Sequence, residues 1–411
     1  MLKLKRAEDF LIFLTILFLP TQLGRHFWPQ FSYIYSLKVD YLSPTIYFWD
    51  LLIVGLFTLF IFQKRAVNAK ALTIFLFFMF TQAASILAAQ NIGAGLVRLE
   101  QYLIGGLFGL YLSAQDFKGL KKRIALPLII SILAESLLAL AQVIKTAGLG
   151  FWILGERNFS ITTPAIAKFD FYGIEFLRPY ATFSHPNVLA AFLLIGIWFL
   201  TQLDNYKKIK NMAAVLALVG LILTFSRTAI FAAIFSSVLF LRKKPLAAAL
   251  ILITFLSPLL FIRFSSLFNY DSLTFLRREE LAKASWEIFL QNPMLGVGLN
   301  NFIPTLSADI ISGPNRFLQP VHNIFLLSLS ETGLVGLVGF LTLIGYPILK
   351  LLKLNPKSCP QHTPFSEVNP LLLIWGIIVF LGLFDHYFLT LPQGIRLFFL
   401  VWGLSLPSML K

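Results

Sequence analysis

A succession of long apolar stretches, separated by short polar gaps, runs along this chain and limits what it can fold into. A helix needs about 20 apolar residues to cross the hydrocarbon core of a bilayer. With 57% hydrophobic and 13% charged residues, the chain is also far less charged than soluble domains, which are about one quarter charged. We therefore predict an all-α, polytopic integral membrane protein whose single transmembrane domain, residues 1–411, has about twelve transmembrane helices. The stretches are roughly 10–23, 45–62, 71–89, 97–113, 124–146, 187–203, 211–225, 228–241, 246–262, 333–352, 370–388 and 394–410.

Basic residues predict how these helices are oriented. Lys and Arg gather in every second gap, and cytoplasmic loops of membrane proteins carry the excess of these residues. Both termini are therefore expected in the cytoplasm, with the stretch after Lys3, Lys5 and Arg6 as an uncleaved first span. The clusters hold 20 of the 34 basic residues and, with their five acidic residues, account for the whole net charge of +15. A charge confined to one side indicates anionic membrane lipids as partners, and not nucleic acid.

Two longer segments, 147–186 and 263–332, contain the Pro, Gly, Asn and charged residues that the apolar stretches lack. We predict that both lie outside the membrane, on the face opposite the basic clusters. The second should contain a helix at 276–290, followed by a tight loop at two glycines. Its end should form a short interfacial helix at 321–331, and 333–352 should be the crossing helix.

Few charged or strongly hydrogen-bonding side chains lie within or beside the outer half of the predicted spans. Such groups are expensive to hold at membrane depth, so a functional role is the default interpretation there. We single out eight of them as candidate site residues. They are Arg178, Asn187, Arg227, Arg277, Arg278, His322, Asn323 and Glu331.

Each candidate also has a structural interpretation. Arg227 could snorkel to the outer headgroups, and Arg178 could pair with Glu175. Arg277 and Arg278 could form ion pairs along a solvated helix, and a backbone carbonyl could satisfy His322 at a helix start. The segment around His185 and Asn187 is more typical of a helix cap than of a catalyst. Other polar groups are interpreted as buried and structural or are left open: Arg98, Glu100, Glu135, Asp385 and His386.

The candidate residues suggest one kind of chemistry when they are taken together. Several arginines bind a phosphate-rich anion well, because the planar guanidinium fork matches phosphate oxygens. A neutral histidine can take a proton from a hydroxyl near neutral pH. No Asp-rich metal motif or Gly-rich phosphate loop is present, and Cys359 is the one cysteine, so neither a metal nor a cofactor is expected. The set suits group transfer from a diphosphate leaving group to an alcohol.

Four sequence blocks, in order along residues 178–340, resemble the O-antigen ligase and O-antigen polymerase (Wzy-C-like) superfamily of bacterial membrane glycosyltransferases. Each block alone is weak, whereas four in the same order are fairly specific. The rest of the chain matches only in its pattern of spans. The blocks are RPYATFSHPN from Arg178, TFSRTA from Thr224, the run from Arg278 through NPMLGVGLNNF from Asn292, and HNIFL from His322 with ETGLVG from Glu331.

This resemblance implies a GT-C-like fold and a metal-independent, inverting glycosyltransferase in the bacterial cytoplasmic (inner) membrane, with its active site facing the exterior or periplasm. The implied donor is a polyprenyl-diphosphate-linked glycan, and the acceptor is lipid A core, another glycan or a protein. The catalytic histidine would be His322, oriented by Asn323 and Glu331. The arginines that bind diphosphate would be Arg227 and Arg277 or Arg278, with Arg178 as a further candidate and Asn187 in a supporting position.

Two other functions stay open at this stage. A transporter or flippase of an anionic lipid or solute could use the same outer arginines, with Glu100 and Glu135 along its path. Against this, the sequence contains no inverted repeat and no matched pair of interrupted spans. A non-catalytic membrane scaffold is the third possibility.

Overall fold

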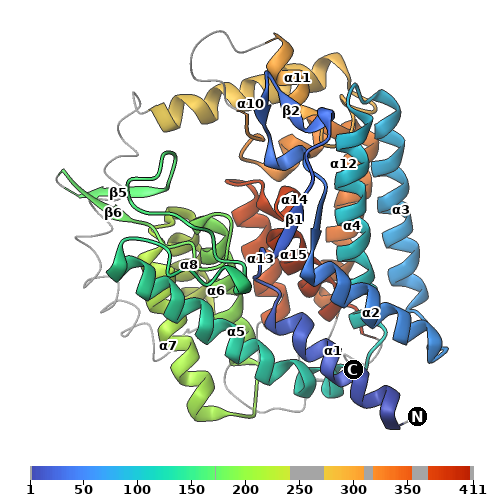
Figure 1. Ribbon diagram of the computed structural model, residues 1–411. Helices are drawn as coiled ribbons and strands as arrows, with labels where there is room; N and C mark the ends of the chain where they lie inside the picture. Colours follow the sequence, from blue (N-terminus) through green and yellow to red (C-terminus); the bar gives the residue numbers. More distant parts are fainter. Residues whose placement is uncertain (1, 172, 241–272, 310–317, 354–368, 408–411) are drawn as a thin grey trace.

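The computed structural model describes residues 2–171, 173–240, 273–309, 318–353 and 369–407, and these are mostly helical, as predicted (Figure 1). The predicted span 246–262, together with 263–272 and 310–317 of the second external segment, lies outside the described residues. The helices are α1 (Leu2–Leu17), α2 (Phe48–Phe62), α3 (Ala69–Ser85), α4 (Ile92–Ser113), α5 (Phe117–Lys145), α6 (Pro186–Thr201), α7 (Lys207–Leu223), α8 (Arg227–Phe240), α10 (Leu273–Gln291), α11 (Phe302–Asp309), α12 (Ile324–Leu352), α13 (Pro370–Gly382), α14 (Tyr387–Thr390) and α15 (Pro392–Leu404).

Three described helices are long and apolar enough to cross a membrane by themselves, namely Ala69–Ala88, Phe117–Lys145 and Ile324–Leu352. Four shorter helices are similarly apolar. The described residues are thus mostly helical and contain candidate membrane spans, whereas the number of about twelve spans and the cytoplasmic termini stay predictions. The start of α1 lies at the end of the molecule opposite α10 and α11 (Figure 1).

Among the described residues, the expectation of an all-α chain omitted three small two-stranded antiparallel sheets, two of which are hairpins. Two of the sheets lie within 24–47. The hydrophobic pattern did not mark 24–44 as structured, and residues 45–47 form a strand where the predicted span 45–62 begins. The third sheet lies within the predicted external segment 147–186. Such sheets need only two to four residues a strand, too few to produce a clear alternating pattern. The strand pairs are β1 (Gly24–His26) with β4 (Thr45–Tyr47), β2 (Tyr33–Ile34) with β3 (Leu37–Lys38), and β5 (Lys168–Phe171) with β6 (Ile174–Leu177).

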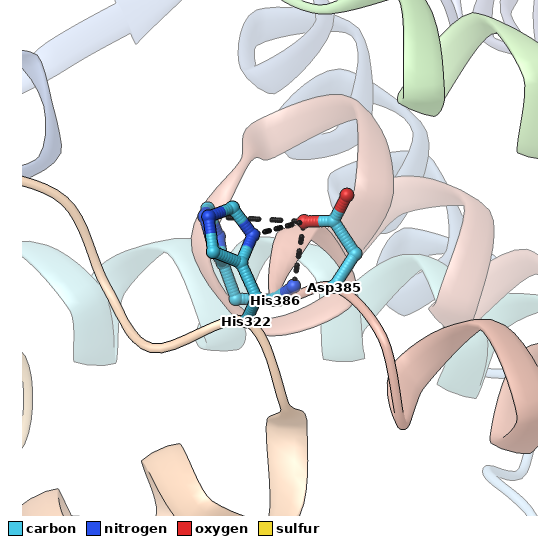
Figure 2. Close-up of side chains that lie close together, drawn as sticks. All are labelled: His322, Asp385 and His386. Atoms are coloured by element: carbon cyan, nitrogen blue, oxygen red, sulfur yellow. Dashed lines mark hydrogen bonds and ion pairs between the residues drawn. The ribbon is translucent and has the colours of Figure 1, made fainter. Parts of the chain in front are cut away.

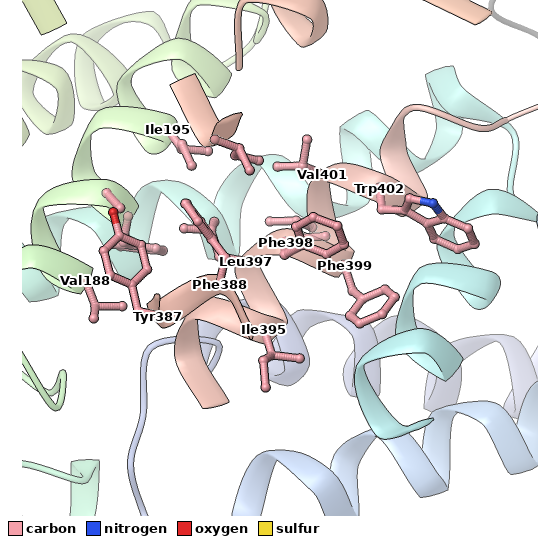
Figure 3. Packing of buried hydrophobic residues seen from close by; sticks show 14 of the residues in the cluster. Val188, Ile195, Tyr387, Phe388, Ile395, Leu397, Phe398, Phe399, Val401 and Trp402 are labelled. Atoms are coloured by element: carbon pink, nitrogen blue, oxygen red, sulfur yellow. The ribbon is translucent and has the colours of Figure 1, made fainter. Parts of the chain in front are cut away.

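The C-terminal helix α15 packs in the middle of the hydrophobic core, against α4, α6, α13 and α14 (Figure 3). Phe399 and Trp402 are almost completely buried. They fit because α4 has glycines where a side chain would collide: a Cβ at Gly105 would lie 2.6 Å from the Phe399 ring, and one at Gly109 would lie 2.7 Å from Trp402. Small residues allow close helix packing in membranes. These glycines therefore set the position of α15 against α4, and with it the position of α14, which packs on α15.

A buried carboxylate ties α1 to its neighbours near the basic end of the chain. Glu8 accepts two hydrogen bonds of 2.9 Å from Arg65 and one of 2.6 Å from Tyr111, and Arg123 lies 3.2 Å away. Burial raises the pKa of Glu8, but Tyr111 and the two arginines outweigh this and lower it. Arg65 and Arg123 therefore bind a carboxylate of this chain, and are not simply headgroup anchors.

Helix α12 is broken where the sequence predicted a change from an interfacial to a crossing helix. Gly333 has a non-helical conformation with φ 61° and ψ −164°. The backbone N–H groups of Leu334 and Val335 donate to the carbonyls of Pro293 (2.8 Å) and Met294 (3.2 Å). The loop after α10 thus satisfies backbone groups that the break releases, as buried backbone in a membrane protein requires.

Gly333→Ala should lower the stability of the protein by about 2 kcal/mol or more. An alanine there would have to adopt a positive φ, which is unfavourable for a residue with a side chain, and its Cβ would collide with backbone. The added Cβ would lie 2.3 Å from the carbonyl carbon of Met294. Gly345→Ala in the same helix is the control, since nothing lies within 4 Å of its Cβ position. Thermal melting in detergent at a fixed scan rate should show a clearly lower midpoint for Gly333→Ala alone. Equal midpoints would show that the break needs no glycine.

Candidate functional site

Two connections that are distant in the sequence bring three polar side chains together (Figure 2). His322 precedes α12, while Asp385 and His386 lie between α13 and α14. Nδ1 of His322 is 3.5 Å from Oδ1 of Asp385, and Nε2 of His386 is 3.9 Å from the same oxygen. Asp385 is 7% exposed, whereas the side chain of His322 is 20% exposed. His322 is therefore the member of the group that a molecule from outside can reach.

Local hydrogen bonds explain why these connections leave the helices where they do. Asn323 is the N-cap of α12, and its Oδ1 accepts from the backbone N–H groups of Phe325 and Leu326 at 2.8 and 3.0 Å. Its Nδ2 donates to the carbonyl of Leu383 at 3.2 Å. Asn323 thus caps one helix and holds the end of another beside His322.

The predicted continuous span 370–388 is wrong at its end, because α13 stops at Gly382. Oδ1 of Asp385 accepts from the backbone N–H of His386 at 2.8 Å. A short acidic side chain that binds nearby backbone competes with helix continuation. The sequence leaves the roles of Asp385 and His386 open, and the signal that could have placed them is an acidic residue and a histidine that interrupt an apolar stretch.

The two buried members of the group, Asp385 and His386, differ in whether they carry a charge. Burial raises the pKa of Asp385, but the close contact with His322 and the charges of the nearby histidines bring it well below the ordinary value. Burial lowers the pKa of His386 to about 3, which its attraction to Asp385 offsets only in part. Its Nδ1 is 2.6 Å from Oγ1 of Thr390. Asp385 is consequently a carboxylate and His386 a neutral ring.

Asn187 connects Asp385 to Arg178. The side-chain Nδ2 of Asn187 donates to Oδ2 of Asp385 at 2.8 Å, and its Oδ1 accepts from Nη2 of Arg178 at 2.7 Å. A helix cap was expected around His185 and Asn187. The residue that caps α6 is His185, whose Nδ1 accepts from the backbone N–H of Asn187 at 3.1 Å. Asn187 is therefore inside α6, and its side chain is free for a contact across the molecule.

The guanidinium of Arg178 is buried, and it donates a hydrogen bond from Nε in addition to the one from Nη2 to Asn187. Nε of Arg178 binds the backbone carbonyl of Thr224 at 2.7 Å, at the turn that leads to Arg227. Burial lowers the pKa of Arg178 to about 10, and the positive charges of Arg227 and Arg278 add to this effect. The structural alternative of a pair with Glu175 is wrong, because that carboxylate lies 2.7 Å from Lys168.

Arg227 and Arg278 reach the same region from different helices. Arg227 is the first residue of α8, and Arg278 lies in the first turns of α10. Both side chains are half-buried, and neither has a carboxylate within 4 Å among the described residues. Cations in this setting, which also repel one another, favour an anion between them. Arg277 is half-buried too, and the positive charge of Arg278 helps to lower the pKa of both Arg178 and His185.

The turn that carries Arg227 is braced from two sides. Phe225 has a left-handed φ of 49°. Its ring stacks on Phe169 of strand β5 with centroids 4.3 Å apart. Oγ1 of Thr224 donates to the carbonyl of Leu221 at 2.6 Å. Packing therefore sets the direction in which Arg227 leaves the turn. A side chain that only snorkelled to lipid headgroups would not need a turn held in one direction.

Glu331 does not contact His322. It is buried, and Oε1 accepts from the backbone N–H of Phe302 at 3.3 Å, at the start of α11. The acidic groups of the transport alternative differ in their surroundings. Glu135 is buried and accepts 2.8 and 3.0 Å hydrogen bonds from Thr182, whereas Glu100 is exposed and not buried as we expected.

His322, Asp385 and His386 also form a group whose ligand atoms all lie within 4.8 Å of one another. Imidazole and carboxylate are donors that zinc accepts. The sequence motifs predict no metal site and do not indicate this cluster. Two of the three ligand residues already have other partners, since Asp385 binds Asn187 and His386 binds Thr390.

No curated protein matches the chain. Residues 212–341 match the family model described as O-antigen ligase (Wzy_C). This range runs from α7 through the break in α12 and includes three of the sequence blocks. The segment that carries Arg227, Arg278 and His322 is therefore similar to the O-antigen ligase family, which confirms the resemblance that the sequence motifs indicated.

Proposed function

We propose that this protein is a metal-independent, inverting glycosyltransferase that moves a glycan from a polyprenyl-diphosphate donor to an acceptor hydroxyl at the external face of the bacterial cytoplasmic membrane. The observation that carries the proposal is the pairing of His322 with Asp385 beside two arginines that have no carboxylate partner among the described residues. The family match over 212–341 supports glycosyl transfer in a membrane.

His322 takes the proton of the acceptor hydroxyl. Its Nδ1 faces Asp385, so a proton on Nδ1 leaves the lone pair of Nε2 for the acceptor. Asp385, an ionised carboxylate, stabilises the imidazolium that forms when Nε2 is protonated. The acceptor oxygen then bonds to the anomeric carbon while the bond from that carbon to the diphosphate oxygen breaks. One displacement from the face opposite the leaving group inverts the configuration.

Arg227 and Arg278 bind the diphosphate. Negative charge builds up on the departing diphosphate in the transition state, and preorganised cations stabilise that charge. A planar guanidinium also offers two parallel hydrogen bonds to phosphate oxygens. Arg178 is less suited to direct binding, because two of its three guanidinium nitrogens donate to Thr224 and Asn187.

The purified protein, given a polyprenyl-diphosphate glycan and acceptor glycosides, should release polyprenyl diphosphate and form a glycoside of inverted anomeric configuration. Mass spectrometry and NMR of the products measure both, and EDTA should leave the rate unchanged. Movement of the donor across proteoliposomes without bond cleavage would instead establish a transporter. Loss of activity in EDTA with recovery in zinc would place a metal at His322, Asp385 and His386.

His322→Ala should lower transfer at least about a hundredfold, because general base catalysis typically contributes 10²–10⁴. Asp385→Asn should lower it less, and should move the acid limb of the pH–rate profile to lower pH, because a neutral amide no longer stabilises the protonated imidazole. His26→Ala, in β1, is the control and should retain wild-type turnover. Wild-type turnover in His322→Ala would remove this residue from the mechanism.

Arg227→Lys keeps the positive charge but loses the guanidinium fork, so it should lower transfer at least about tenfold. The loss of a charge-assisted hydrogen bond costs about 1.5–3 kcal/mol, and 1.36 kcal/mol corresponds to tenfold in rate. Arg25→Lys is the matched control, since the exposed Arg25 guanidinium lies 5.7 Å from the centre of the Phe27 ring. Equal, mild effects at the two positions would show that Arg227 is only a membrane anchor.

A further inference from the structure

Four side chains from three separate parts of the sequence form one chain of polar contacts, in which three links are hydrogen bonds and the last is an ion-pair contact. It begins at the carbonyl of Thr224, passes through Arg178 and Asn187 to Asp385, and ends at His322. The three hydrogen bonds are 2.7, 2.7 and 2.8 Å long, and the final contact is 3.5 Å. The chain thus joins the turn that carries Arg227 to the carboxylate that faces the histidine.

Asn187 is the link whose chemistry is most restricted. It must accept a hydrogen bond from a guanidinium on one side and donate one to a carboxylate on the other. A side-chain amide has both an acceptor oxygen and a donor nitrogen, whereas aspartate offers two acceptors and leucine neither. No capping role explains Asn187, because His185 occupies that position in α6.

Charge gives a second reason for this arrangement. Asp385 and Arg178 are both buried, and a buried charge without a partner is strongly destabilising. The amide between them lets the two opposite charges compensate each other without direct contact. Oδ1 of Asp385 consequently remains directed at His322, which a bidentate pair with Arg178 would prevent.

We propose that Asn187 is a positioning residue that acts on the reaction through Asp385, and that Arg178 serves the same chain in place of binding the diphosphate. This inference rests on the proposed function for its kinetic consequences. This chain of contacts has His322, the base, at one end and the turn that carries Arg227 at the other. It therefore keeps His322 and the anion-binding turn in one relative position.

The test is a double-mutant cycle on transfer kinetics. Asn187→Leu should lower kcat about tenfold or more with a change in donor KM below about threefold, since one charge-assisted hydrogen bond is lost. In an Asp385→Ala background the same substitution should change kcat less than about threefold, because its target is absent. Asn187→Asp should behave like Asn187→Leu, since it keeps the size but loses the donor. Full additivity, or a raised KM with unchanged kcat, would overturn the proposal.

Asn369→Ala is the matched control for folding. Asn369 caps α13 through its Oδ1, which accepts from the backbone N–H of Leu371 at 3.0 Å, so its loss should lower the melting temperature but not kcat. A second readout needs no activity. In ¹⁵N-histidine-labelled protein, with the signal identified by His322→Gln, the ring of His322 should be mainly the Nδ1–H tautomer and should lose this preference in Asn187→Leu. An unchanged tautomer would contradict the proposal, even in a protein that transfers no glycan.

Discussion

The contacts of the Asp385 carboxylate hold α6, the α13–α14 connection and the start of α12 together at the candidate site. A carboxylate that is almost fully buried must be hydrogen-bonded or paired, and this one receives the backbone N–H of His386 and the amide of Asn187, with His322 at ion-pair distance. These contacts join α6, the α13–α14 connection and the start of α12. The end of α13, the direction of Asn187 and the orientation of the His322 ring toward Asp385 all follow from satisfying one negative charge.

Much of the helical architecture could be predicted from the sequence, because apolar periodicity and length report directly on helices in a membrane. The helix predicted at 276–290 is α10, with Leu281, Ala284 and Ile288 on its buried face. The tight loop is also present, with left-handed φ values at Gly296 and Gly298. The short two-stranded sheets were missed because strands of two to four residues leave no periodic signal.

The candidate site could be predicted only one residue at a time. Charge at membrane depth pointed to Arg178, Arg227 and His322, but no pattern along the chain indicates which of them meet. Asp385 escaped prediction because its partner Asn187 lies 198 positions away, and only tertiary packing brings them together. The same limit applies to Glu331, which was predicted to orient His322, whereas its carboxylate binds the backbone at the start of α11.

The break at Gly333 has a consequence for how this protein can diverge in sequence. The loop after α10 and the broken helix are joined by main-chain groups, with a further bond from the backbone N–H of Val297 to the carbonyl of Ser330 at 3.0 Å. Main-chain bonds do not depend on the identity of the residues that make them. Exposed side chains of this loop can therefore change without loss of these bonds, while Gly296 and Gly333 preserve the close contact between the loop after α10 and the broken helix α12.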